Sequence, residues 1–312
     1  MTAQGKPRSF FANSFGLLKQ TFQEWLEDKA PQLGAALAYY TVFSLAPLIL
    51  VLLALVDLLF RNDPGGAWNK ITEQMNYFLD RSAVEVVQNI AQKASQPGKG
   101  TVATIIGVLL AIFGASGVFG QLQDALNTIW GVKAKPGAGI WGFLRVRFLS
   151  FAMVGGICFL LLVSLSLESL LKAFSHYVQA LLPGGILIAV SVYLIFDLAV
   201  VIFLFAIIFK FLSDAKIQWR DVWIGATMTA LLFAVGKWAL GLYLGSGSAA
   251  SAYGAASSLI TLLLWIYYSS QILLFGAEFT QVYANRAGRA VAPDEHAVRI
   301  ETKEIETSKR GG

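Results

Sequence analysis

Six long apolar stretches divide the chain, and most of its charged residues lie between them. The stretches lie near residues 33–60, 101–123, 144–171, 185–209, 222–244 and 254–283. A helix needs about 20 residues to cross the roughly 30 Å hydrocarbon core of a bilayer, and every stretch reaches that length. The fifth is the weakest, because Lys237 interrupts it. The pattern predicts an all-α, polytopic membrane protein with six transmembrane helices in a membrane domain of residues 33–284.

The segment before the first apolar stretch, residues 1–32, has an amphipathic pattern. Large apolar residues recur there at helical spacing, namely Phe11, Phe15, Leu18, Phe22 and Trp25. This spacing predicts an interfacial amphipathic helix on the cytoplasmic surface of the membrane. A cytoplasmic helix packed on the loops fits the pattern about as well.

Two further segments lie outside the apolar stretches. Residues 61–100 contain two short amphipathic patterns, "AWNKITEQMNYFL" and "SAVEVVQNIAQKA". These patterns predict an outer helical hairpin between the first and second spans. Residues 285–312 are charged and poor in apolar side chains, so we expect a disordered cytoplasmic tail.

Composition and charge agree with a membrane location. The 312 residues are 56% hydrophobic and 14% charged, whereas about 25% of the residues in soluble proteins are charged. Six spans place both termini on one side, and 17 of the 24 Lys and Arg residues fall on that side. Six fall on the other side, and Lys237 lies within a span. Because Lys and Arg are enriched in cytoplasmic loops, both termini are expected in the cytoplasm.

Polar residues line one face of the first span. Tyr40, Ser44 and Pro47 follow one another at helical spacing. Pro47 lacks a backbone donor and is expected to kink the helix. Lipid offers no partner to the carbonyl that this kink frees. The face is therefore expected to line an interior cavity.

A second polar stripe runs along the sixth span. Tyr267, Gln271, Leu274 and Glu278 fall on one helical face. Three of these four side chains are polar, which indicates that the stripe faces the interior of the helix bundle.

Two ionisable residues lie deep in neighbouring spans. Asp197 is at the centre of the fourth span, and Lys237 is a few residues to the outer side of the middle of the fifth. Tyr193 lies one turn from Asp197 on the same face. Ionisable groups at this depth usually face protein or water. The pair is interpreted as a substrate or proton-coupling site, or equally as a structural ion pair that holds the helix register.

Small residues recur in the second span. Gly107, Gly114, Gly117 and Gly120 would allow neighbouring helices to approach closely. Helix packing is the favoured interpretation, and a flexible or broken helix lining a cavity is the alternative.

The sequence contains few residues that could bind a metal or cleave RNA. It has one cysteine, Cys158, and two distant histidines, His176 and His296. RNA cleavage needs a metal cluster or an acid–base pair beside phosphate-binding groups. We therefore expect no enzyme activity, no metal, no cofactor and no nucleic-acid partner.

Three long motifs together resemble a known family. They are "AALAYYTVFSLAPLILVLLAL", "GASGVFGQLQDALNTIWGV" and "SLITLLLWIYYSSQILLFGAEFTQVYA". In this order they resemble the YihY/BrkB family of bacterial inner-membrane proteins, over roughly residues 30–284. The resemblance implies six membrane helices in the bacterial cytoplasmic membrane. It also brings two older labels, virulence factor and ribonuclease BN, and no active site that could be carried over.

Three functions follow from these patterns. The first is a transporter or flippase, in which the lipid bilayer is the setting and a small solute or a lipid-like amphiphile is the substrate. Its support is the deep charge pair, the proline and the polar stripes. The alternative is a non-transporting membrane scaffold or envelope-integrity factor. The third, a membrane-associated ribonuclease for tRNA processing, is disfavoured by the missing chemistry.

Overall fold

The computed structural model describes residues 10–59, 63–78, 81–94, 117–135, 185–245 and 257–300. Within these ranges the chain is mainly helical, with two small two-stranded sheets. The third predicted span, Gly107 and Gly114 lie outside the described residues.

Four long helices correspond to the first, fourth, fifth and sixth apolar stretches: α2 (Ala30–Leu59), α7 (Gly185–Ile207), α8 (Trp219–Gly245) and α10 (Ser257–Arg286). A π-helical turn, η1 (Ile208–Leu212), extends α7. A further helical segment covers residues 117–129 and runs beyond the predicted end of the second span. Three helices in the described ranges are long and apolar enough to cross a membrane, over Leu194–Leu212, Trp219–Tyr243 and Leu259–Arg286. These are the predicted fourth, fifth and sixth spans, and the count of six stays a prediction.

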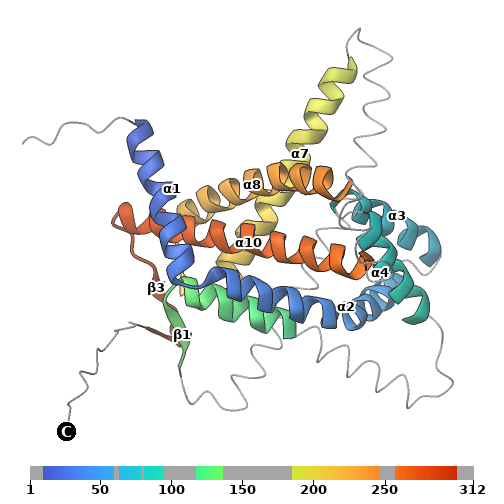
Figure 1. Ribbon diagram of the computed structural model, residues 1–312, viewed down its shortest axis with the longest axis horizontal. Helices are drawn as coiled ribbons and strands as arrows, with labels where there is room; N and C mark the ends of the chain where they lie inside the picture. The colour runs from blue at the N-terminus through green and yellow to red at the C-terminus, as the bar shows by residue number, and fades with distance from the viewer. Residues whose placement is uncertain are drawn as a thin grey trace, which may run out of the picture.

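Helix α10 lies at the centre of this arrangement (Figure 1). It packs against α2 on one side and α8 on the other, and α8 packs in turn against α7. Helices of a membrane bundle approach each other closely where the residues at their contact are small. Between α8 and α10 this contact is a reciprocal pair of glycines and threonines.

The glycine–threonine crossing consists of Gly225 and Thr229 on α8 and Gly276 and Thr280 on α10. A Cβ atom at Gly225 would overlap the Thr280 side chain, and one at Gly276 would overlap the Thr229 side chain. Both threonines are fully buried. Each hydroxyl donates to the glycine carbonyl one turn back in its own helix, at 2.7 Å. The crossing therefore depends on the absence of side chains at two positions.

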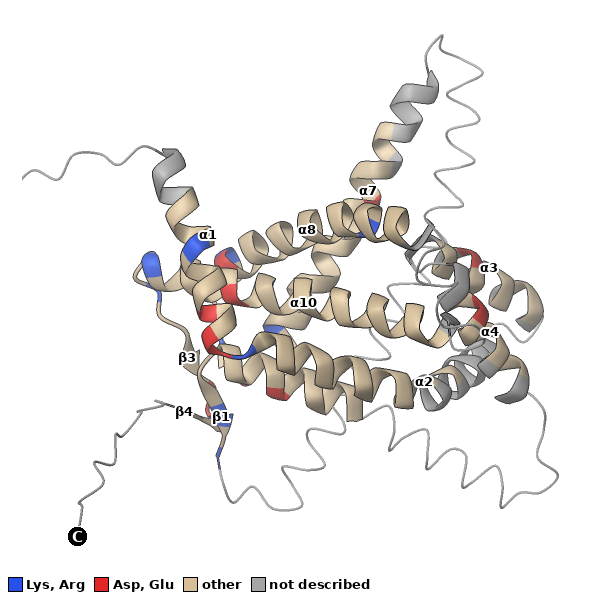
Figure 2. Ribbon diagram, viewed as in Figure 1, with Lys and Arg blue, Asp and Glu red and all other residues tan. Residues whose placement is uncertain are grey.

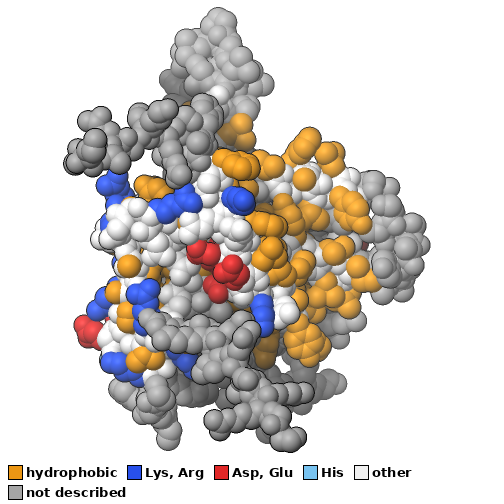
Figure 3. Space-filling view, turned by 60° about the vertical axis from the view of Figure 1, so that its left-hand side comes forward, with side chains coloured by type: hydrophobic (Ala, Val, Ile, Leu, Met, Phe, Trp, Pro, Cys, Tyr) orange, Lys and Arg blue, Asp and Glu red, His pale blue; other side chains and the backbone are white. Residues whose placement is uncertain are grey.

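The two ends of the bundle differ in composition. Helix α1 (Phe10–Glu27) and the strands lie at one end, and α3 (Pro64–Phe78) and α4 (Arg81–Ala94) lie at the other (Figure 1). Charged residues are concentrated at the α1 end (Figure 2). Figure 3 brings this end forward and shows acidic side chains gathered beside a broad hydrophobic band.

Helices α3 and α4 occupy the two amphipathic patterns of the predicted hairpin. Helix α4 packs against α2 and α10. Its Val87 and Ala91 are buried against Ile49 of α2. This packing covers the end of the bundle that lies opposite α1.

Helix α1 carries apolar residues on a surface that the described residues leave uncovered. Phe15 is 73% exposed and Phe22 is 52% exposed. On its other side the helix is tied to α10, because Arg286 donates to the carbonyl of Gly16 at 2.7 Å and to Gln20 Oε1 at 2.8 Å. The exposed side is the one expected to lie on the membrane surface, and that location stays a prediction.

The expected disorder of residues 285–312 is wrong for residues 285–300. Strand β1 (Val132–Ala134) pairs antiparallel with β4 (Ala297–Arg299), and β2 (Ala215–Lys216) pairs antiparallel with β3 (Ala292–Pro293). An ion pair anchors the segment, since Arg289 Nη2 lies 2.6 Å from Oδ1 of the buried Asp221. Strands β1 and β2, which are distant in the sequence, thus provide hydrogen-bond partners for backbone groups of the tail.

Candidate functional site

A cavity of about 590 Å³ lies between α7 and α8. Its walls are mainly apolar, and they include Leu198, Phe233 and Trp238. Trp238 is 69% exposed, so the cavity borders on exposed apolar surface. Asp197 and Lys237 supply the charged groups of its lining.

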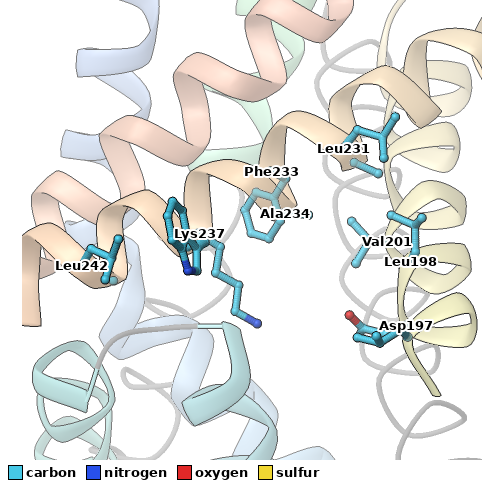
Figure 4. A pocket seen from close by; sticks show the side chains of 12 residues that line it. Asp197, Leu198, Val201, Leu231, Phe233, Ala234, Lys237 and Leu242 are labelled. Atoms are coloured by element: carbon cyan, nitrogen blue, oxygen red, sulfur yellow. The ribbon is translucent and has the colours of Figure 1, made fainter. Parts of the chain in front are cut away.

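Asp197 and Lys237 extend toward each other across this cavity, one from each helix (Figure 4). An attractive electrostatic interaction links them. Asp197 lies 15 residues before the end of η1, and Lys237 lies 18 residues after the start of α8. At about 1.5 Å per residue, the two positions lie at similar distances along their helices from the connection between η1 and α8. The structure thus brings together the two ionisable residues that the sequence identified.

Charges in such a cavity act strongly because the surrounding dielectric constant is low. A carboxylate can bind a cationic group and an ammonium can bind an anionic one, while the apolar walls can hold a hydrocarbon chain. The same pair can also hold α7 and α8 in register. The arrangement is chemically suited to either role.

The stripe on α10 faces α1 and α2 and lies apart from this cavity. Gln271 lies over Gly34, and its Nε2 donates to the carbonyl of Pro31 at 3.5 Å. Leu274 and Glu278 are fully buried, and Tyr267 is half-buried.

The polar face of α2 meets the helix of residues 117–129. A Cβ atom at Gly117 would lie 3.6 Å from Tyr40 and 3.9 Å from the hydroxyl of the buried Ser44. At Gly120 no described residue comes within 4 Å of such an atom, so the packing role predicted for this glycine finds no partner there.

Pro47 does not divide α2, which is one helix from Ala30 to Leu59. The side chains of Pro47 and Tyr193 lie outside the described residues. No residue of the α2 face or the α10 stripe is among the described residues that line the cavity. The predicted polar groups therefore fall into three separate places.

Comparison of the sequence with known proteins places the chain in a family. The sequence profile described as virulence factor BrkB matches residues 21–301. The chain belongs to the virulence factor BrkB family. The resemblance of the three motifs is thereby confirmed.

Relatives of this BrkB-family chain carry the name UPF0761 membrane protein. The protein of Tolumonas auensis is 27% identical over 264 residues, which cover 81% of this chain and 80% of the relative. The protein of Teredinibacter turnerae is 27% identical over 283 residues, which cover 87% of this chain and 62% of the relative. The match to the Pseudomonas paraeruginosa protein covers 63% of that relative. The chain thus spans less than two thirds of two of these three relatives. No solved structure matches.

Three groups in this BrkB-family chain escaped the sequence analysis. Asp214 accepts hydrogen bonds from Gln123 Nε2 at 3.1 Å and from Asn127 Nδ2 at 2.9 Å. The others are the Asp221–Arg289 ion pair and a contact between Asp28 and Glu278. The polar end of residues 117–129 was the available signal for Asp214. Asp28 in its turn and Asp221 in the first turn of α8 carried no local signal for the other two contacts.

Proposed function

We propose that this BrkB-family protein moves a small solute or a lipid-like amphiphile across the membrane. The carrying observation is the cavity of about 590 Å³ in which Asp197 and Lys237 face each other. Ionisable residues deep in a membrane domain are costly and usually functional. We assign the cavity as the substrate site.

The walls of the cavity favour an amphiphile over a fully polar solute. Apart from its charge pair the lining is mainly apolar, and Leu194, Trp238 and Leu242 of the lining are exposed. An amphiphile would place its polar group between the charges and its hydrocarbon part along these side chains. The exposed apolar surface of α1 would lie at headgroup depth at one end of the bundle.

Reconstitution into liposomes tests the proposal. The purified protein is assayed for solute flux and for scrambling of fluorescent lipids, as wild type and as Asp197→Asn. Glu85→Gln is the matched control, because it neutralises an exposed acid on α4 outside the cavity. We expect activity in wild type and Glu85→Gln and a clear loss in Asp197→Asn. Folded wild-type protein that moves neither solute nor lipid would contradict transport.

The scaffold function is the outcome that the double variant distinguishes. If Asp197 and Lys237 only hold two helices together, Asp197→Asn combined with Lys237→Met removes both charges and leaves cellular function intact. If the pair binds substrate, the double variant is inactive although it folds.

We also propose that the protein lies in the bacterial cytoplasmic membrane with both termini in the cytoplasm. Reporter fusions after Gly100 and at the C-terminus test this orientation. The first should report the outer side and the second the cytoplasm. A C-terminal fusion that reports the outer side would contradict the topology.

A further inference from the structure

The carboxyl group of Glu278 is buried without a conventional partner. Its side chain has an exposed fraction of 0%. Among the described residues, no donor hydrogen-bonds to either of its oxygens. Burial of a carboxylate with neither donor nor cation beside it is strongly unfavourable. The buried carboxyl group therefore needs a proton or a cation that compensates its negative charge.

A second carboxyl group occupies the position of the missing donor. Asp28, in the turn between α1 and α2, lies within hydrogen-bonding reach of Glu278. Ionised carboxylates only accept hydrogen bonds. A hydrogen bond between these two groups therefore exists only when one of them carries a proton. Burial raises the pKa of Asp28, and the hydrogen bond with Glu278 opposes that rise.

Among the described residues, the other charges that act on the pair are also negative. Glu24 and Glu27 repel negative charge on both Asp28 and Glu278. Glu27 is exposed and Glu24 is half-buried, as Asp28 is. The burial of these carboxyl groups thus rises from the exposed Glu27, through the half-buried Glu24 and Asp28, to the fully buried Glu278.

Within the described ranges, no Lys or Arg is among the charged groups that act on Asp28 and Glu278. Lys29 follows Asp28 but its side chain is exposed. Arg286 of α10 binds Gly16 and Gln20 of α1. At this level α8 presents the uncharged glycine–threonine crossing. No group of three or more ligating side chains that could hold a metal occurs in the described part of the chain.

We infer that Asp28 and Glu278 together bind one proton, which they share across the contact of α1, α2 and α10. Binding takes one proton from water, forms one O–H bond on the pair and changes its charge from two negative to one negative. The inference goes beyond transport and stands whether or not the protein moves a solute. Loss of the proton places two negative charges side by side, so release should loosen the contact of the α1–α2 turn with α10.

Infrared spectroscopy of the purified protein in lipid vesicles tests the inference through the carbonyl stretch of a protonated carboxyl group. The wild type should show this band at neutral pH and lose it as the pH rises. Glu278→Gln should abolish the band, because the amide donates to Asp28 in place of the proton. Asp28→Asn removes the neighbouring charge, so its band should disappear at a lower pH than in wild type.

Glu27→Gln is the matched control, since it removes an exposed acid beside the pair and should keep the band. Absence of the band from folded wild type at neutral pH would overturn the inference. Undiminished intensity in Glu278→Gln would do the same, as would an Asp28→Asn titration identical to that of wild type. If Glu278→Gln fails to fold, the wild-type and Asp28→Asn titrations still decide.

Discussion

Gly225→Ala places a methyl group into the contact between α8 and α10. The added atom would overlap the hydroxyl of Thr280 and would also lie within 2.8 Å of its Cβ and 3.1 Å of its Cγ2. Because all three atoms surround the position, rotation of the threonine side chain cannot make room. The two helices must separate instead.

The cost can be worked out from two opposing effects. Overpacking of a tight contact costs about 1–3 kcal/mol, and a clash that no rotamer relieves belongs at the upper end. Replacing glycine by alanine in a helix returns about 1 kcal/mol. Gly225→Ala should therefore lower the free energy of unfolding by about 2 kcal/mol, and Gly276→Ala should match it because it meets Thr229 in the same way.

Gly241→Ala is the matched control on the same helix. No described residue lies within 4 Å of a Cβ atom at Gly241. This variant should be neutral or slightly more stable, so the two variants of α8 should differ by up to about 3 kcal/mol. Thermal unfolding of the purified proteins in detergent, followed by helical circular dichroism, measures the difference.

A double variant identifies the clash as the cause. Thr280→Ala removes the hydroxyl and methyl groups that the new methyl group meets. The double variant Gly225→Ala with Thr280→Ala should therefore lose less unfolding free energy than the sum of the losses in the two single variants. A coupling of about 0.5–3 kcal/mol is usual for residues in contact. Equal midpoints for Gly225→Ala and Gly241→Ala, or strict additivity in the double variant, would refute the close-contact reasoning.

Three further predictions concern the end of the bundle that carries α1 and the strands. Asp214→Ala removes the acceptor of two amide side chains and should cost about 1–3 kcal/mol in thermal unfolding, whereas Asp214→Asn, which keeps an acceptor, should cost less. Arg289→Met leaves the buried Asp221 without its cation, so limited proteolysis should cut the C-terminal strands faster, and an unchanged cleavage rate would contradict the anchor. Burial raises the pKa of Asp28, so its contribution to stability is present at low pH and is lost as the pH rises above the usual aspartate pKa of about 3.9. Asp28→Asn should flatten the corresponding fall of the melting temperature, and an unchanged slope would argue against the shift.

The apolar helices and the family could be predicted from sequence for a local reason. A membrane helix satisfies its backbone hydrogen bonds within itself, so its signal lies in one continuous stretch. This is why the ends of the predicted fourth, fifth and sixth spans lie within three residues of the ends of α7, α8 and α10. The pairing of Asp197 with Lys237 was also within reach, because consecutive helices are neighbours and both residues lie at similar depth.

The sequence by itself determined where the helices run, and tertiary structure decided which polar groups meet. Arg286 and Gln20 are 266 residues apart, and Asp214 and Asn127 are 87 apart. No local pattern encodes such contacts. The tail of residues 285–312 was expected to be disordered because it is poor in apolar residues, yet strand partners and the buried Asp221 order residues 285–300. In the sequence Glu278 is likewise only one member of a polar stripe, and only the tertiary structure places Asp28 of the α1–α2 turn beside it.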